Sequence, residues 1–215
     1  MRWLVKRGFF AKHKKQIYFH GKRNKKVIAL TFDDGPSKET REALKVLMKH
    51  HAKGTFFIWG ERIKGRGKII EKIKKEGHEI GNHTFSHKRM LFKSRKFMKE
   101  EIQKCDEELD KLGIKTNLFR PPGGVLSYNL LSVLKKLNKK IILWDDNSKD
   151  WEKPGVKKAE KNVLSHVRNG SIIDFHDFIE GVGKNKSLTK ILNETIPELQ
   201  NRGYKLVTVS ELLFN

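Results

Sequence analysis

The stretch VIALTFDDGP, residues 27–36, decides the fold and points to the chemistry. Its apolar start predicts a buried strand over residues 27–32. Two adjacent carboxylates, Asp33 and Asp34, follow at the exit of this strand, and a Gly-Pro pair then turns the backbone away. Side chains alternate along a strand, so the two carboxylates point in different directions and can serve a metal and a proton separately. For an isolated Asp-Asp-Gly, the alternative is a solvated loop start or a helix N-cap.

Short apolar runs alternate with amphipathic segments of helical length along the rest of the chain, which predicts βα units around a parallel sheet or barrel. The predicted strands are 27–32, 54–59, 78–82, 117–120, 141–144, 171–175 and 204–209. The predicted helices lie near 38–50, 66–76, 94–112, 127–138, 156–168 and 187–201, with Ser37, Ser94 and Ser127 as N-caps. Seven strands with intervening helices indicate an α/β fold that forms a closed or nearly closed barrel.

Polar side chains recur where these strands end. The set comprises Asp33, Asp34, His83, Arg120, Asp145 and His176. In α/β barrels the active site is built at the carboxyl ends of the strands. We therefore expect these side chains to meet at one edge.

The charge of the chain indicates anionic partners. Its 215 residues carry a net charge of +22, which attracts cell-wall polymers, membrane surfaces or nucleic acid. Nucleic acid is the least favoured, because no aromatic residues alternate with basic ones and the lysines are interleaved with Glu. The single cysteine, Cys105, fits a half-buried helix position and cannot form a disulfide within the chain.

Residues 1–26 are predicted to form a basic arm, and residues 27–215 one catalytic domain. The arm contains ten Lys and Arg and no Asp or Glu. Its apolar runs of three residues are too short for a signal peptide or a membrane span. We expect a cytoplasmic protein, or a surface-associated one whose leader is not in this sequence.

His83 and His87 are four residues apart, a spacing that brings two imidazoles to one face of a helical turn. Together with Asp34 they supply two nitrogens and one oxygen, a set that suits catalytic zinc with one coordination position open for water. Cobalt, nickel or manganese are the alternatives to zinc.

Asp33 is then the candidate base that takes a proton from that water. Arg120 can grip its carboxylate, although an Arg before a Pro-Pro turn can also lie at the surface. His176 is the candidate acid, and Asp150 is available to keep it protonated. Alone, a His after a strand is more often structural.

In their order, these segments resemble the polysaccharide deacetylase family, family 4 of the carbohydrate esterases, over roughly residues 27–210. TFDDG at 31–35 and HTFSH at 83–87 match its first two motifs without change. The resemblance implies a distorted (β/α) barrel of about seven parallel strands, Asp33 as catalytic base, and a metal held by Asp34, His83 and His87.

The later motifs match with departures. Arg120 begins the family's Arg-x-Pro and is implied to tether the base, and the Gly123 N–H could bind the oxyanion. Asp150 and Trp151 end the family's Asp-x-x-Asp-Trp, whose first place holds Asn147 here. The second Asp of that motif tunes the catalytic His.

Asp174 stands where the family commonly has a Leu that lines the acetyl pocket. By strand alternation Asp174 faces the same side as His176. In an acetyl pocket its carboxylate must turn into a hydrogen bond with a Lys or a backbone N–H. Asp174→Leu then keeps or raises activity, whereas a pocket that recognises a polar group loses it.

The function that the resemblance implies is hydrolysis of N-acetyl groups on N-acetylhexosamine units of a glycan such as peptidoglycan or chitin. One alternative is a metal-dependent hydrolase of O-acetyl esters or small cyclic amides or imides, which Asp174 favours. The other is a cationic glycan-binding protein with weak catalysis, which Asn147 and Asp174 favour.

Overall fold

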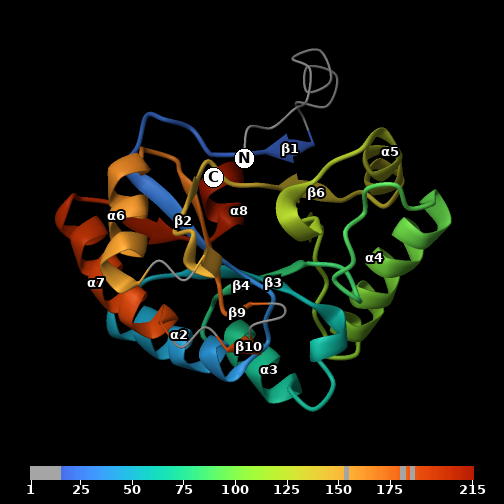
Figure 1. Cartoon of the computed structure of the whole chain (residues 1–215), viewed down its shortest axis with the longest axis horizontal. Coiled ribbons are helices and arrows are strands. Elements are labelled where there is room, and N and C mark those ends of the chain that lie inside the picture. The colour runs from blue at the N-terminus through green and yellow to red at the C-terminus, as the bar shows by residue number, and fades with distance from the viewer. Residues whose placement is uncertain (1–15, 153–154, 180–182, 185–186) are drawn as a thin grey trace.

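A computed structural model describes residues 16–152, 155–179, 183–184 and 187–215 (Figure 1). Nine strands form one sheet, in which every pairing is parallel. The sheet curls into a barrel-like arc with helices on its outer side, so the predicted α/β barrel fold is confirmed. The order in the arc is β1-β6-β5-β4-β3-β2-β8-β7, and β11 also pairs with β2.

The strand from the opening stretch, β2, is the centre of the sheet. It pairs with β3 on one side and with β11 and then β8 on the other. All its residues after Val27 are buried. The seven predicted strands are found as β2 (Val27–Asp33), β3 (Gly54–Ile58), β4 (Glu79–Asn82), β5 (Leu118–Phe119), β6 (Lys140–Ile142), β8 (Ile172–His176) and β11 (Lys205–Val207).

Four further strands consist of two residues each, too short for a hydrophobic pattern: β1 (Ile17–Tyr18), β7 (Asp146–Asn147), β9 (Phe178–Ile179) and β10 (Gly183–Lys184). β9 and β10 form a separate antiparallel pair. β7 follows β6 in the same chain segment, but β6 pairs with β5 whereas β7 pairs with β8. Segment 140–147 therefore connects the two sides of the arc.

The helices lie where the amphipathic pattern predicts them: α2 (Lys38–Lys49), α3 (Gly67–Lys75), α4 (Arg95–Asp110), α5 (Tyr128–Lys136), α6 (Val156–His166) and α7 (Leu188–Asn201). The side chains of Ser37, Ser94 and Ser127 accept the backbone hydrogen bonds expected of N-caps. The end of the last predicted strand is instead a short helix, α8 (Val209–Phe214), because Thr208 and Glu211 form a capping box.

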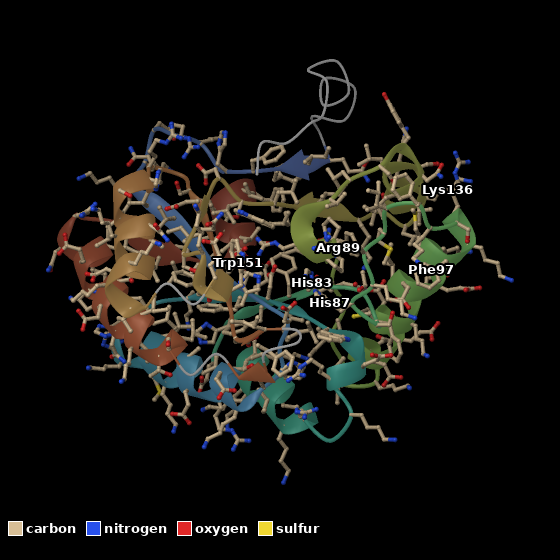
Figure 2. The ribbon with its side chains drawn as sticks, viewed as in Figure 1. His83, His87, Arg89, Phe97, Lys136 and Trp151 are labelled. Carbon is tan, nitrogen blue, oxygen red and sulfur yellow. The ribbon has the colours of Figure 1, made fainter. Side chains whose placement is uncertain are left out.

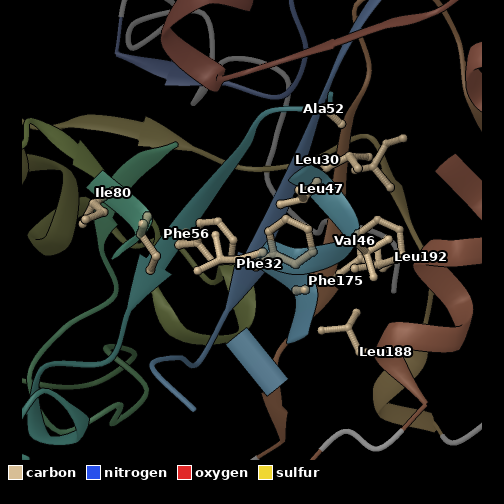
Figure 3. Packing of buried hydrophobic residues seen from close by; sticks show 14 of the residues in the cluster. Leu30, Phe32, Val46, Leu47, Ala52, Phe56, Ile80, Phe175, Leu188 and Leu192 are labelled. Carbon is tan, nitrogen blue, oxygen red and sulfur yellow. The ribbon is translucent and has the colours of Figure 1, made fainter. Parts of the chain in front are cut away.

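The main core lies between the sheet and the helices (Figure 3). The Phe32 ring stacks on Phe56 at 4.7 Å and on Phe175 at 5.9 Å, which joins three neighbouring strands. A smaller apolar cluster around Phe57 fills the inside of the arc, and Val209 of α8 belongs to it. Cys105 is fully buried in α4 rather than half-buried.

The second half of the predicted basic arm lies against the sheet. Ile17 and Tyr18 of β1 pair with β6, and Arg23 forms an ion pair with Asp145 at 2.6 Å. Residues 1–15 of that arm lie outside the described residues. Among the described residues, no helix is both long and apolar enough to cross a membrane.

Candidate active site

The parallel register brings the predicted polar residues to one edge of the barrel. Asp33 is the last residue of β2 and lies opposite His176, the last residue of β8. His83 and Arg120 directly follow β4 and β5. Asp145 is the exception, because its carboxylate binds Arg23 and the backbone N–H of Ile172 where β8 begins.

Asp34, His83 and His87 form one cluster, in which their ligand atoms lie within 4.8 Å of one another. Asp34 Oδ1 is 2.9 Å from His87 Nε2 and 3.4 Å from His83 Nε2. Figure 2 shows the two imidazoles next to each other, and their ring centres are 5.0 Å apart.

The four-residue spacing predicted that the two histidines lie on a helical turn, and this prediction is wrong. Residues 83–87 are not helical and contain a bend at 85–86. Thr84 has φ 70° and His87 has φ 58°, and Asp34 has φ 75°. Left-handed backbone at non-glycine residues costs free energy and concentrates at functional sites.

Further contacts fix the imidazole rings of His83 and His87 in place. His83 Nδ1 is 2.8 Å from the carbonyl oxygen of Arg120. A carbonyl only accepts, so Nδ1 carries the hydrogen and the Nε2 lone pair faces Asp34. The His87 ring stacks on Trp59 at 4.7 Å.

The cluster fits a divalent cation. Asp34 Oδ1 is buried and accepts no hydrogen bond among the described residues. The lone pair of His83 Nε2 faces this oxygen, and two acceptors 3.4 Å apart are stabilised by a cation between them.

Arg120 is fully buried and binds the other carboxylate of the opening stretch, that of Asp33. Its Nη1 donates to Asp33 Oδ1 at 2.7 Å, and its Nε donates to the carbonyl of Ile142 at 3.1 Å. The guanidinium also lies over the Phe57 ring, 4.1 Å from its centre. Arg120 is therefore a buried anchor and not a surface residue.

His176 and Asp150 form a second pair at the same edge. His176 Nδ1 is 2.9 Å from Asp150 Oδ1, and the His176 backbone N–H donates to Asp150 Oδ2 at 2.8 Å. Burial alone would lower the pKa of His176, but the carboxylates of Asp150 and Asp174 raise it well above its usual value. Trp151 packs edge-on against this imidazole at 5.1 Å.

Asp174 faces the same side as His176, as alternation predicted, since both belong to a group whose ligand atoms lie within 4.8 Å. Its partner is neither a Lys nor a backbone N–H, because Oδ1 accepts from Arg120 Nη1 at 2.9 Å. Gly123 is exposed in the loop after Arg120, with φ 65°.

Asp177 is a site neighbour that sequence reasoning missed. It is fully buried, its backbone N–H donates to the Asp33 carbonyl at 3.2 Å, and its carboxylate accepts from Thr40 Oγ1. Burial raises the pKa of Asp177 to about 7. A Cβ at Gly35 would lie 2.5 Å from this carboxylate, so Gly35 makes room for it. The feature of the sequence that could have identified Asp177 is its position directly after His176.

Comparison with known proteins agrees with this geometry. A family model described as polysaccharide deacetylase matches residues 20–142. The chain belongs to the polysaccharide deacetylase family. A peptidoglycan-N-acetylglucosamine deacetylase of Bacillus cereus is 35% identical over 193 residues, which are 88% of this chain and 89% of that protein.

Two further relatives also match nearly the whole of this chain. The peptidoglycan-N-acetylmuramic acid deacetylase PdaA of Bacillus subtilis is 31% identical over 94% of this chain and 76% of its own. The crystal structure of the Bc1960 peptidoglycan N-acetylglucosamine deacetylase, bound to an N-hydroxybenzamide, has a TM-score of 0.89 and 32% identity. It covers 95% of this chain and 96% of that one. This polysaccharide deacetylase is thus a hydrolase that removes N-acetyl groups from glycans, and its family is metal-dependent.

Proposed function

We propose that this deacetylase hydrolyses the N-acetyl group of N-acetylhexosamine units in peptidoglycan. The observation that carries the proposal is the convergence, at one edge, of the Asp33–Arg120 pair, the Asp34–His83–His87 cluster and the Asp150–His176 pair. An amide hydrolase needs a proton acceptor for water, a stabiliser for the oxyanion and a proton donor for the amine.

We assign Asp34, His83 and His87 as the ligands of one divalent ion, with zinc as the metal that this donor set suits best. When bound, such an ion polarises the acetamide carbonyl and makes water easier to deprotonate.

Asp33 takes the proton of the attacking water. Its Oδ1 is held by Arg120 at 2.7 Å, whereas Oδ2 lies on the side of the metal ligands, 3.8 Å from His83 Nε2. Oδ2 is therefore the oxygen that accepts the proton. Arg120 keeps the carboxylate oriented through the reaction.

His176 protonates the leaving nitrogen. Its Nδ1 binds Asp150, so Nε2 is the nitrogen that can reach the substrate. The exposed Gly123 offers its backbone N–H to the oxyanion, and Trp151 borders the acid. The result is acetate and a free amine on the sugar.

Asp150→Asn is expected to move the alkaline limb of the kcat–pH profile to lower pH. An acid is active in its protonated form, so activity is lost as pH rises through the pKa of His176. The Asp150 carboxylate contributes most to raising that pKa, and Asn lacks the charge. Kinetics measured from about pH 5 to about pH 10, a range that extends below and above the usual pKa of His, would show the shift. An unchanged alkaline limb in a folded Asp150→Asn protein would show that His176 is not the acid.

A surface next to the site supports peptidoglycan over a neutral glycan. It consists of loop 88–94 and segment 123–129, which Arg95 joins through a hydrogen bond to Asn129 at 2.9 Å. Phe92 is 94% exposed and Tyr128 is 70% exposed. We call it the aromatic rim.

The aromatic rim is entirely basic in charge. Residues 88–99 contain six Lys and Arg, and neither 88–99 nor 111–144 contains an Asp or Glu. Arg89 follows His87 by two residues, and its Nε would lie 3.9 Å from a Cβ placed at Gly123. Exposed rings suit the faces of sugars, and the cations suit the carboxylates of stem peptides, which chitin lacks.

Acetate release from peptidoglycan is expected to exceed that from chitopentaose, and to fall more steeply as salt rises. Phe92→Ala is expected to raise KM on peptidoglycan several-fold, which corresponds to the loss of about 1 kcal/mol from one ring contact. Met48→Ala, which truncates an exposed residue on α2, is the control. No acetate from either glycan, with divalent metal supplied, would contradict the proposed function. Equal salt dependence would contradict the role of the rim.

The alternatives lose their support. An ester or cyclic amide substrate rested on Asp174, which is paired with Arg120 instead of lining a pocket. A binding protein without turnover rested on Asp174 and Asn147, whereas the Arg120–Asp33 and His176–Asp150 contacts support turnover.

A further inference from the structure

Arg120 binds two carboxylates and not one. Its Nη1 donates to Asp33 Oδ1 at 2.7 Å, to Asp174 Oδ1 at 2.9 Å and to Thr31 Oγ1 at 2.9 Å. This nitrogen has two hydrogens for three acceptors, so Asp174 and Asp33 share the donor. The position of one carboxylate therefore depends on the other.

Asp174 is placed too deep to contact substrate directly. Its side chain is 1% exposed, and its Oδ2 has no hydrogen-bond partner among the described residues. A buried acceptor without a partner is costly, and a Leu would avoid that cost. A carboxylate at this position therefore costs stability that an apolar side chain would not.

The strand register shows which neighbouring positions could supply a carboxylate to Arg120 in place of Asp174. Asp174 of β8 lies opposite Thr31 of β2 on one side and opposite Asn147 of β7 on the other. Paired residues of parallel strands point to the same face of a sheet, so these three side chains form one row on the inner face. Both departures from the family motifs, Asn147 and Asp174, are therefore direct neighbours.

We propose that Asp174 is a positioning residue that supplies the second carboxylate on Arg120, in place of one at position 147. It acts through Arg120, which orients Asp33. The inference rests on the proposed role of Asp33 as the base. It differs from the pocket role expected from the sequence, since Asp174 determines how the base is held and not which acyl group fits. Because Asp174 binds Arg120, the expectation that Asp174→Leu keeps or raises activity is reversed.

A double-substitution cycle tests the proposal. Asp174→Leu is expected to lower kcat by about tenfold to a hundredfold, as for other residues that orient a reacting group, with KM and metal content unchanged. Asn147→Asp alone places a third carboxylate beside one guanidinium and is expected to lower both kcat and Tm. The Asn147→Asp/Asp174→Leu protein is expected to return to within about threefold of the wild-type kcat, because its carboxylate again reaches Arg120.

Asp146→Asn is the matched control. Asp146 is a buried carboxylate on the same short strand, but it lies opposite Ile173 and faces the helix side of the sheet. Its kcat is expected to match the wild type. Wild-type kcat in Asp174→Leu, or a double variant no better than Asp174→Leu, would overturn the proposal.

Melting temperatures separate this inference from the proposed function. If the wild type releases no acetate, the proposed function fails, but the cycle can still be read from Tm. Asn147→Asp is then expected to lower Tm when Asp174 is present and to raise it when position 174 is Leu. Equal effects of Asn147→Asp in both backgrounds would overturn the inference by itself.

Discussion

Asp33→Asn is expected to reduce kcat by about 10³-fold while metal content stays at the wild-type level. The amide keeps the shape of the carboxylate and can still accept the hydrogen bond from Arg120 Nη1. It cannot take a proton from water. The effect is therefore expected in kcat and not in KM, which acetate release under saturating and limiting substrate would separate.

Two measurements accompany this variant. Thermal unfolding shows whether the buried Arg120 tolerates the loss of one negative charge, which Asp174 partly offsets because it binds the same nitrogen. Elemental analysis shows whether the ion is retained. If metal and activity disappear together in a folded protein, Asp33 is a ligand and the roles of Asp33 and Asp34 are misassigned.

The sequence was sufficient for the frame of the fold because its signals are local. The apolar run before Asp33 is a strand, and the serines at 37, 94 and 127 cap helices, since a cap needs only its own first turn. The strands β1 and β7 were missed because two residues carry no period, and their pairing depends on distant segments. For the same reason the sequence did not predict that segment 140–147 connects the two sides of the arc.

The site was predictable in its membership and less so in its contacts. Residues at strand ends converge because parallel strands end at one edge, and this placed Asp33, Arg120 and His176 together. The partner of Asp174 was not predictable, because it depends on the depth at which the Arg120 side chain crosses the barrel to reach Ile142 and Leu143. The bend at His83–His87 was also beyond a spacing argument, since its left-handed residues have no glycine to mark them.

His87→Ala is expected to lower the bound metal to below about one-tenth of an equivalent and to abolish acetate release, since two protein ligands rarely hold a catalytic ion. His87 is the sharper test of the cluster. His83 is buried and its Nδ1 binds the Arg120 carbonyl, so His83→Ala also disturbs the segment that holds the base. The His87 ring is partly exposed and stacks on Trp59, so its removal leaves the strands intact.

The His87→Ala protein tests the assignment of the metal ligands. His166→Ala, which removes an exposed imidazole at the end of α6, controls for nonspecific binding by surface histidines and is expected to keep one ion per chain. Metal content after dialysis against a weak chelator, measured beside Tm, distinguishes loss of a ligand from loss of the fold. A folded His87→Ala protein that retains one tightly bound ion would show that the ion lies elsewhere. Asp33, Asp174 and His176, whose ligand atoms also lie within 4.8 Å of one another, would then be the place to look for it.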